Sequence, residues 1–344
     1  MPVAPPARPS LPRPAEPPGR PASDVVSDLL HAVRLRGAVY FAVEASAPWV
    51  AEAPPAAQLA SHIMPGAPHV IEYHAVVSGR VFASLVDGPA VELGPGDIVL
   101  FPKGDAHVMA SAPGMRGPRD LPHRARARHE RLPILVDFAA ADAPDRARLI
   151  CGFLACDALP FNPLLGSLPR LLHVPRGERT RHVMLDHMVE AALVESRAPR
   201  PGGEAALARM SELMFVEVVR NHLATITTSA GGWLSGLRDP IVGRALGALH
   251  ARPAIEWTLD KLGREVGASR STLAERFTDL VGEPPMQYLT RWRMQLAASR
   301  IADGATLAEV APEVGYGSEA SLSRAFKKVV GVAPAEWRAS RGGV

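Results

Sequence analysis

The spacing of apolar and polar residues divides the chain into a strand-like first half and a helical second half. From about residue 24 to residue 156, short apolar alternations are broken by Gly and Pro, as at Gly94-Pro95-Gly96, which marks a turn. The alternations predict strands at residues 37–43, 70–77, 80–86 and 97–101, and a later strand at 148–156. Several short strands at close spacing favour a small β-barrel or sandwich.

Two long helical patterns follow the strands. Apolar residues recur at helical spacing at about 178–197 and again at about 204–224, which predicts two amphipathic helices. Methionine-rich stripes of this kind are ordinarily core or a packing seam. Because the pair connects two regions of different pattern, the stripes could also form a dimer interface. They consist of Val183, Met184, Met188 and Leu193 in the first helix, and of Leu207, Met210, Leu213, Met214 and Val218 in the second.

The C-terminal region contains short helices with strong start and stop signals. Thr258 precedes an expected helix at Leu259–Val266, a Gly267-Ala268 turn follows, and Ser269 caps a second helix at Arg270–Val281. Two helices joined by a short turn that contains glycine are typical of a helix-turn-helix unit. The expected core face of the second helix is Leu273, Phe277 and Leu280, and its outward face is Ser271, Glu275 and Thr278.

The same pattern returns about fifty residues later. Thr306 and Glu309 form a capping box that opens a helix expected to reach Val314. Pro312 lies inside that helix and should bend it or end it early. A Gly315-Tyr316-Gly317 turn leads to Ser318, which caps Glu319–Val330. The expected core face of this last helix is Leu322, Phe326 and Val329, and its outward face is Ala320, Ser321, Arg324 and Lys327.

A long helix is expected between the two units, at Pro285–Ala302. At 1.5 Å per residue it spans roughly 25–30 Å. Successive major grooves on one face of DNA are about 34 Å apart. A rigid spacer of this length would therefore let one chain place two recognition helices in adjacent grooves.

Net charge supports this interpretation once it is placed along the chain. Residues 240–344 hold 14 Lys and Arg against 11 Asp and Glu, an excess of +3, whereas residues 1–239 hold 24 of each. The excess therefore lies where a phosphate-facing surface would need it. A stretch at residues 112–133 carries six arginines and is expected to be a solvated loop.

Composition excludes several other classes of protein. No run of about twenty apolar residues or signal-peptide segment is present, which argues against a membrane protein. The two cysteines, Cys151 and Cys156, are too few for a disulfide framework, and on one strand they would point to opposite faces. We expect a reducing, cytoplasmic setting. Residues 1–22 contain nine prolines and are expected to be a disordered tail.

Several C-terminal motifs resemble one known family. Residues 281–297 read VGEPPMQYLTRWRMQLA, residues 324–327 read RAFK and residues 331–334 read GVAP. With the Gly315-Tyr316 turn, they make residues 240–341 similar to the DNA-binding domain of the AraC family. Pro312 departs from the family pattern, as does Leu322, where the family often has Phe. The resemblance implies DNA contacts by Ser269, Arg270, Ser271, Thr272, Ala274, Glu275, Ser318, Ala320, Ser321, Arg324, Lys327 and Lys328.

Among these residues, Arg324 is the leading candidate for a base contact, because bidentate Arg to guanine is the commonest specific pairing. The first recognition helix is poor in long donors, which suggests that it positions the protein more than it specifies sequence. Activation of transcription through RNA polymerase is implied by the family resemblance alone.

The N-terminal region resembles a cupin β-barrel. Residues 96–107 read GDIVLFPKGDAH, which is similar to the second cupin motif, and the resemblance implies that His107 points into the barrel. In metal-binding cupins this His is a ligand. At the spacing of the earlier motif, Glu72 replaces the first His, His74 is retained and a later Glu is missing. Glu72, His74 and His107 could still form a three-ligand site for Zn or a similar divalent ion, and Cys151 could join it. The alternative is a hydrogen-bonded barrel interior without metal.

These features predict an α+β architecture. A tail at residues 1–22 precedes a cupin-like sensor domain at 23–175, a helical connector with a dimerisation role at 176–230 and a double helix-turn-helix domain at 231–344. The expected function is that of a non-enzymatic transcription regulator that binds double-stranded DNA and a small-molecule effector. One alternative is a metal-dependent cupin oxygenase fused to a DNA anchor. Another is a DNA-binding protein whose barrel only dimerises.

Overall fold

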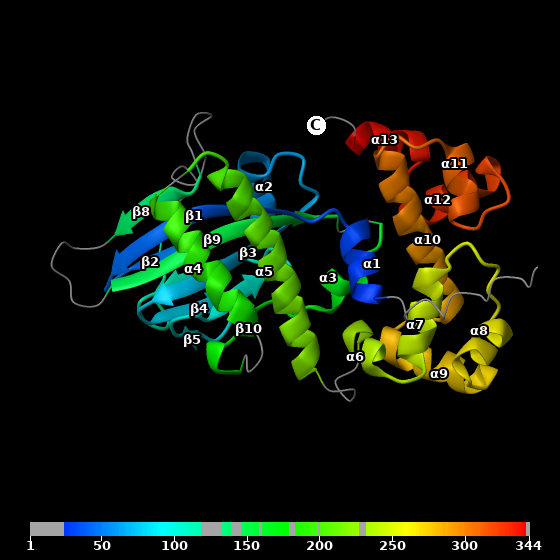
Figure 1. Ribbon diagram of the computed structural model, residues 1–344, viewed down its shortest axis with the longest axis horizontal. Helices are drawn as coiled ribbons and strands as arrows, with labels where there is room; N and C mark the ends of the chain where they lie inside the picture. The colour runs from blue at the N-terminus through cyan, green and yellow to red at the C-terminus, as the bar shows by residue number, and fades with distance from the viewer. Residues whose placement is uncertain are drawn as a thin grey trace, which may run out of the picture.

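The computed structural model describes residues 24–117, 132–138, 146–157, 160–178, 183–198, 200–226 and 232–341. A sheet-rich N-terminal domain and a helical C-terminal domain lie side by side along the longest axis (Figure 1). The proline-rich tail and most of the arginine-rich stretch fall outside the described residues. Among the described residues, no helix combines the length and apolar character needed to span a bilayer.

The N-terminal domain contains two sheets. The first is six-stranded, in the order β10-β6-β3-β9-β1-β8, and the second is four-stranded, in the order β2-β7-β4-β5. The strands are β1 Arg36–Ser46, β2 Val50–Ala53, β3 His69–Ser78, β4 Val81–Leu85, β5 Val91–Leu93, β6 Ile98–Phe101, β7 His107–Ala110, β8 Ile134–Phe138, β9 Arg146–Cys156 and β10 Leu172–Val174. All five strands expected from the sequence are present, and β2, β5, β7, β8 and β10 are additional.

Apolar residues of both sheets meet in one core. Val76 and Phe101 of the larger sheet pack with Val81 and Met109 of the smaller one. Cys151 belongs to this core, whereas Cys156 packs in a different cluster, which confirms that the two cysteines face opposite sides of β9. The strand therefore separates the interior between the sheets from the surface that the helices cover.

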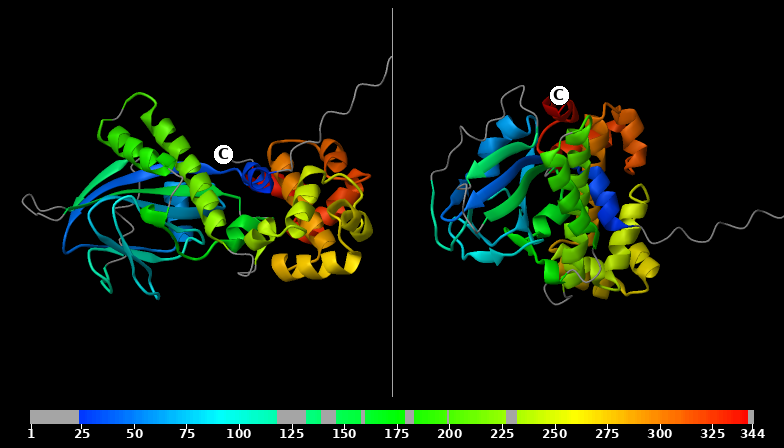
Figure 2. Two further views of the ribbon diagram at one scale, coloured as in Figure 1. Left: turned by 60° about the horizontal axis from the view of Figure 1, so that its bottom comes forward. Right: turned by 60° about the vertical axis from the view of Figure 1, so that its left-hand side comes forward.

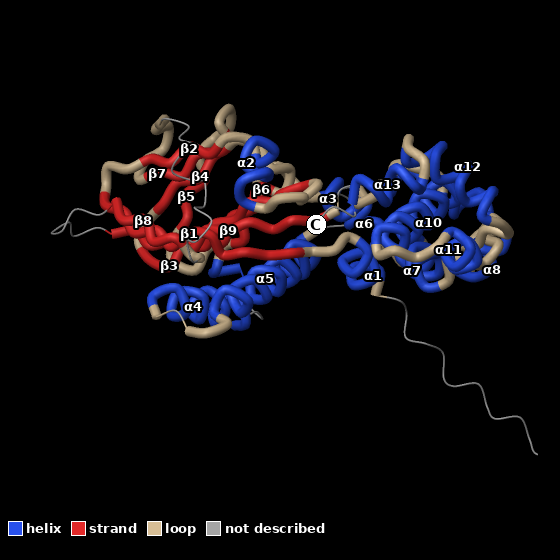
Figure 3. Tube along the Cα trace, turned by 90° about the horizontal axis from the view of Figure 1, so that it is seen from above, coloured by secondary structure: helices blue, strands red, loops and turns tan. Residues whose placement is uncertain are grey.

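Helices α4 (Val183–Arg197) and α5 (Gly203–Thr225) cover the outer face of the larger sheet (Figure 3). Gly37 lets β1 approach α5 closely, because an added Cβ would lie 2.6 Å from the Ala208 carbonyl oxygen. The predicted stripes are only partly buried. Met184 and Leu213 are 40% and 43% exposed, so they are not core residues as the helical spacing suggested. The expected helix start at residue 178 is instead a short 3₁₀ turn, Arg176–Glu178.

The C-terminal domain contains eight helices in its described part. They are α6 Trp233–Arg238, α7 Val242–Ala251, α8 Leu259–Val266, α9 Arg270–Val281, α10 Pro285–Ala302, α11 Leu307–Glu313, α12 Glu319–Val330 and α13 Pro334–Arg341. The predicted caps form: the side chains of Thr258, Ser269, Thr306 and Ser318 each accept a hydrogen bond from the first turn of the helix that follows. Both helix-turn-helix units are therefore present at the predicted positions.

Pro312 stays within α11 rather than ending it at once. The helix ends at Glu313, one residue before the predicted end, and the Val314 amide still donates to the Val310 carbonyl at 3.1 Å. Leu322 and Phe326 are fully buried as expected. Val329 is 36% exposed, so the predicted core face of α12 contains one residue too many. Val329 lies in the last turn of the helix, which ends at Val330 with Gly331 as its C-cap.

The long helix α10 divides the C-terminal core in two. Tyr288, Leu289 and Trp292 belong to a cluster that contains the first helix-turn-helix unit and continues into the N-terminal domain. Met294, Ala298 and Ile301 belong to a separate cluster with the second unit and Trp337. The N-terminal helix α1 (Val25–Ala32) lies against α7 and α10, beside the helical domain (Figure 2).

Candidate DNA-binding surface and sensor cavity

The second recognition helix, α12, begins with a reciprocal capping box. The Ser321 amide donates to the Ser318 hydroxyl, and the Ser318 amide donates to the Ser321 hydroxyl, both at 3.2 Å. Ser321 also donates its hydroxyl to the Ser318 carbonyl at 2.7 Å. Ser321 is therefore half-buried and engaged in the cap, whereas the sequence suggested an outward base-reading residue. Ala320, Arg324, Lys327 and Lys328 are exposed as expected.

The cations of α12 differ from several arginines of the domain, which are paired with carboxylates. Arg276 is bound to Asp239, Arg291 to Glu283 and Arg300 to Glu313. Arg324, Lys327 and Lys328 make no ion pair with any residue that the structure describes. Because no described residue neutralises their charge, these three side chains are suited to an anionic partner such as the phosphate backbone.

The first recognition helix, α9, presents a more polar surface. Ser269, Arg270, Ser271, Thr272 and Glu275 are exposed, and Ala274 is half-buried. The hydroxyls of Ser269 and Thr272 lie 2.8 Å apart at the cap, and Arg270 lies 3.8 Å from Asp260 at an exposed position. The helix is held against the domain by Arg276, whose guanidinium donates to the buried Asp239 carboxylate at 2.7 Å.

Asp239 also fixes the start of α7. One carboxylate oxygen accepts the amides of Ile241 and Val242 at 2.9 Å, and the other accepts Arg276. Burial alone would raise the pKa of Asp239, but the hydrogen bonds from Arg276 and the two amides outweigh it and lower the pKa. The carboxylate therefore stays charged and ties α7 to the recognition helix.

A cavity of about 540 Å³ lies in the N-terminal domain. Strands of both sheets contribute to its wall, and most of the lining is apolar or aromatic, which is typical of a small-molecule site. The polar side chains of the lining include Glu72, His74 and His107. All three are buried, at 2%, 9% and 1% exposure.

The three residues form the only metal-type cluster of His, Cys, Asp and Glu among the described residues, with ligand atoms all within 4.8 Å of one another. The Nε2 atoms of His74 and His107 lie 2.9 Å apart, and His107 Nε2 lies 3.8 Å from a Glu72 carboxylate oxygen. The structure thus brings together the three residues that the cupin resemblance implied. Cys151 pairs opposite His74 in the strand register and lines the same cavity, but it lies outside this cluster.

The orientation of His107 is fixed by two contacts. Its Nδ1 lies 3.0 Å from the Asp105 carbonyl oxygen, and its ring stacks on Phe101 with centroids 3.7 Å apart. A carbonyl oxygen can only accept, so Nδ1 carries a proton, and in the neutral form of the ring Nε2 then presents a lone pair to the cavity.

A second buried carboxylate in the cavity wall was not expected from the sequence. Glu52 is 2% exposed and accepts two hydrogen bonds from Arg116, both at 2.8 Å. No sequence pattern predicted Glu52, because β2 is only four residues long. Arg116 belongs to the stretch expected to be a solvated loop and is exposed there, but its guanidinium is held by the buried Glu52. The rest of the stretch, from residue 118 to residue 131, lies outside the described residues.

Comparison with known proteins agrees with these two regions. A family model described as a cupin matches residues 24–224, and a model described as a helix-turn-helix domain matches residues 262–340. The chain is 36% identical over 276 residues to a putative AraC-like transcription regulator of Streptomyces lividans, across 79% of this chain and 88% of that protein. This chain belongs to the AraC-like family of transcription regulators.

One further relative matches most of the chain, and a solved structure matches a smaller part of it. The AraC-like regulator described here is 26% identical over 324 residues to the HTH-type transcriptional regulator AlkR of Acinetobacter baylyi, across 92% of this chain and 99% of that protein. Among solved structures, the C-terminal domain of the response regulator AraT of Geobacillus stearothermophilus is 30% identical. The matched region covers 30% of this chain and 87% of the AraT chain, with a TM-score of 0.29.

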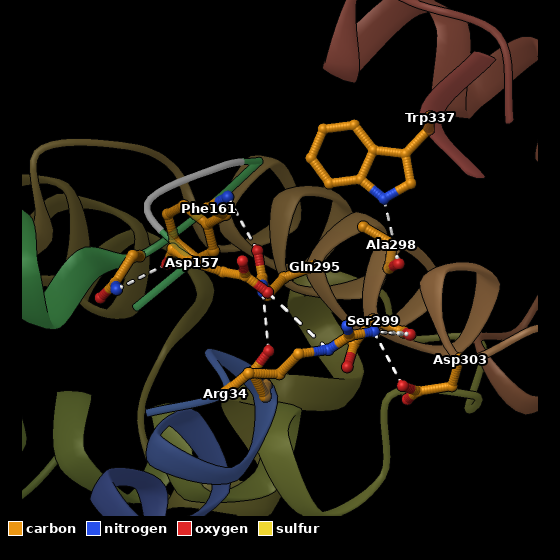
Figure 4. A network of polar contacts seen from close by, with 10 residues as sticks. Arg34, Asp157, Phe161, Gln295, Ala298, Ser299, Asp303 and Trp337 are labelled. Atoms are coloured by element: carbon orange, nitrogen blue, oxygen red, sulfur yellow. Dashed lines mark hydrogen bonds and ion pairs between the residues drawn. The ribbon is translucent and has the colours of Figure 1, made fainter. Parts of the chain in front are cut away.

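In this AraC-like regulator, polar contacts join the N-terminal domain to α10 (Figure 4). The buried Gln295 side chain donates to the Ala32 carbonyl at 2.9 Å and accepts the Phe161 amide at 3.0 Å. Arg34 donates to the Ser299 carbonyl at 2.8 Å and pairs with Asp303 at 2.9 Å. Sequence patterns gave no signal for these contacts, since they join segments more than 130 residues apart.

A buried aromatic cluster supports the same junction. The Tyr288 hydroxyl lies 2.9 Å from the Trp233 indole nitrogen and 2.8 Å from His250 Nε2. Phe161 of the sensor domain packs edge-on against Tyr288 with ring centroids 5.2 Å apart. Burial lowers the pKa of His250 to about 3, so the imidazole is neutral in the folded protein.

Proposed function

We propose that this AraC-like regulator controls transcription by reading a specific DNA sequence and responding to a small molecule held in the cavity of its sensor domain. The observation that carries the DNA-binding part is the pair of capped recognition helices on either side of α10. The cationic α12 is suited to read base edges through Arg324, with Lys327 and Lys328 on phosphates. The hydroxyl-rich start of α9 is suited to position the protein on the backbone.

The experiment that tests DNA reading is selection of DNA fragments by the purified full chain. Fragments recovered at moderate salt should share one motif with two parts about one helical turn apart, because α9 and α12 lie at the two ends of the same rigid helix. Recovery of fragments with no common motif, bound only at low salt, would contradict sequence-specific control and leave only backbone attraction.

The sensor part of the proposal rests on the cavity. Its volume of about 540 Å³ is within the usual range for small-molecule sites, and its wall combines apolar side chains with a few buried polar groups. A ligand that binds the folded state raises the unfolding temperature. Thermal unfolding of the full chain against a panel of small organic molecules and ions should therefore find at least one stabilising ligand. If none stabilises the chain, the alternative in which the domain only dimerises is favoured.

The proposal also covers the oligomeric state, the activation of transcription and the location of the protein. A homodimer is supported by Met184, Val194 and Leu213, which are apolar and exposed on α4 and α5. Activation through RNA polymerase and a cytoplasmic location at the nucleoid belong to the same proposal. The alternative of an oxygenase fused to a DNA anchor would be favoured if the purified chain consumed oxygen with an organic substrate.

A further inference from the structure

We propose that Arg293 is a positioning residue for DNA reading. Its guanidinium fixes the two helix-turn-helix units relative to each other, and this sets the spacing between the two halves of the DNA site that the chain accepts. This role rests on the proposed reading of a specific DNA sequence. Arg293 lies at the middle of α10, which has 18 residues and runs between the two units (Figure 1).

Arg293 leaves α10 at the point where the apolar core of the C-terminal domain divides. Trp292 packs in the cluster that contains the first unit, and Met294 packs in the cluster that contains the second. Successive residues of an α-helix point about 100° apart, so Trp292 and Met294 lie on nearly opposite sides of α10. The half-buried side chain of Arg293 lies between these two directions, where it reaches segments of both units.

The guanidinium holds the loop that leads into the first unit. Nε of Arg293 donates to the Pro253 carbonyl at 2.7 Å, and Nη2 donates to the Ile255 carbonyl at 2.8 Å. Both carbonyls belong to the loop between α7 and α8, and Ile255 packs against the apolar cluster of the first unit. The planar fork of an arginine matches two acceptors on one loop, which the single ammonium of a lysine does not reproduce.

The same guanidinium lies over an aromatic ring of the second unit. Its Cζ is 5.9 Å from the ring centroid of Tyr316, in the turn between α11 and α12. This separation is within the range of a cation–π contact. Tyr316 packs against the apolar cluster of the second unit. One side chain therefore joins the loop before the first unit to the turn within the second.

The loop and the turn also meet directly, at Ala254 and Gly315. Gly315 has a φ of +79°, which favours glycine. A Cβ at this position would lie 2.7 Å from the Ala254 carbonyl oxygen and 2.9 Å from Arg293 Nη2. Ala254 stands between the two residues whose carbonyls accept the hydrogen bonds of Arg293. Close packing of the units at this point therefore needs both the arginine fork and a residue without a side chain.

Two recognition helices at a fixed angle accept one separation of the half-sites. An added base pair moves one half-site by about 3.4 Å along the DNA and rotates it by about 35° around the axis. A rigid pair of units cannot follow this change. A flexible pair can, but it binds the best site less tightly because the effective concentration of the second unit falls. Loss of Arg293 should therefore change the dependence on spacing as well as the affinity.

The first test uses the full chain and the DNA site that it selects. Fluorescence anisotropy compares the selected duplex with duplexes that have one base pair added or removed between the halves. For the unmodified chain, each change should lower the affinity by at least about tenfold, like a lost base contact. For Arg293→Met, affinity for the selected duplex should fall about three- to tenfold, and the further loss on altered spacing should shrink to about twofold. An unchanged spacing dependence in folded Arg293→Met protein would overturn the proposal.

Arg300→Met is the matched control. Arg300 lies on the same helix, but it pairs with Glu313 of the second unit alone, so the spacing dependence should not change. Arg293→Lys keeps the charge without the fork and should behave like Arg293→Met. Full spacing dependence in Arg293→Lys would overturn the proposal. Together with a shallower salt dependence in Arg293→Met, it would assign Arg293 to a phosphate contact.

Three glycines separate the contact between the units from backbone strain. Gly315→Ala places a Cβ against Ala254 and should weaken the spacing dependence as Arg293→Met does. Gly304→Ala also places a side chain at positive φ, +93°, but its Cβ would have nothing within 4 Å. Gly317→Ala changes the same turn, also with nothing within 4 Å. Both controls should keep the full spacing dependence, and an equal effect of Gly304→Ala would contradict a role for the contact.

A measurement without DNA separates this inference from the proposed function. Spin labels on Asp279→Cys in α9 and Lys328→Cys in α12 occupy exposed positions, whereas the two native cysteines are buried. The distance distribution between the labels in the full chain should broaden with Arg293→Met and not with Arg300→Met. If it broadens but the chain selects no common DNA motif, Arg293 fixes the units and the proposed function fails. If a motif is selected but neither the distance distribution nor the spacing dependence changes, the inference fails and the proposed function stands.

Discussion

The hydroxyls of Tyr73 and Ser211 lie 2.6 Å apart in the core between β3 and α5. Tyr73 lies between Glu72 and His74 on β3, and side chains alternate between the two faces of a strand. Glu72 and His74 therefore line the cavity, whereas Tyr73 points to the opposite face and contacts α5. Gly152 on β9 makes room for the tyrosine, because a Cβ at that position would lie 2.4 Å from its hydroxyl oxygen. Movement of β3 on ligand binding would therefore be passed directly to the connector helix.

We expect Tyr73→Phe to lower the free energy of unfolding by about 1 kcal/mol, through loss of one buried hydrogen bond. The variant should bind DNA like the unmodified chain in the absence of ligand but respond less to a ligand in the cavity. Denaturant titration, and DNA affinity with and without a ligand that stabilises the chain, measure the two effects. A full response in the variant would show that β3 and α5 are not coupled through this contact.

Arg324→Ala should weaken binding to the selected DNA site by about 1–3 kcal/mol and relax the base preference at one or two positions. Lys327→Ala should weaken binding to all sequences more evenly, because a phosphate contact carries no sequence information. Fluorescence anisotropy with the selected and a shuffled duplex separates the two. Equal losses on both duplexes for Arg324→Ala would assign this side chain to the phosphate backbone.

Gln295→Leu should destabilise the junction between the domains by about 2–4 kcal/mol, because the buried Ala32 carbonyl and Phe161 amide would each lose a hydrogen bond. Gln287→Leu, at an exposed position of the same helix, is the matched control. Small-angle scattering should show the DNA-binding domain moving relative to the sensor domain in the first variant only. Identical scattering and stability in both variants would show that Gln295 does not join the domains.

Pro312→Ala should stabilise the full chain. Proline in a helix interior costs about 3 kcal/mol relative to alanine, and the substitution would allow an amide at 312 to donate to the Ala308 carbonyl. We expect a gain smaller than that value, because Pro312 lies in the last turn of α11, which ends at Glu313. DNA affinity should rise modestly, measured beside the denaturant titration. Destabilisation would mean that the proline fits the end of this short helix better than alanine does.

The low pKa of His250 predicts acid sensitivity of the helical domain. Its ordinary value is 6.5 and its value in the folded protein is about 3, so between these pH values the unfolded chain binds a proton that the folded protein does not. Stability from this group is therefore complete above pH 6.5 and is lost as the pH falls, at about 1.4 kcal/mol per pH unit. His250→Gln should flatten that slope between pH 6.5 and 5, followed by denaturant titration. An unchanged slope would place the acid sensitivity elsewhere.

Sequence patterns predicted the features that depend on neighbouring residues alone, such as helix caps and strands. Ser269, Thr306 and Ser318 could be placed because a cap needs only its own first turn, and the five strands because alternation reflects burial on one side. Glu52 and Gln295 could not, since each is buried by a segment distant in the chain. The three cavity residues were foreseen only through the cupin resemblance, because strand register brings Glu72 and His74 near His107 and no spacing rule states it. Exposure of Met184 and Val329 shows that helical spacing does not tell how far a buried face extends.

Because α10 divides the apolar core in two, the two helix-turn-helix units are coupled to the N-terminal domain in different ways. The first unit shares apolar packing with the N-terminal domain, and salt has little effect on such packing. The second unit has its own apolar core. The end of α10 beside it is joined to the N-terminal domain by Arg34, which donates to the Ser299 carbonyl and pairs with Asp303. Water and salt compete with such a partly exposed ion pair. The coupling between the N-terminal domain and the second unit should therefore weaken more with added salt than the coupling to the first unit.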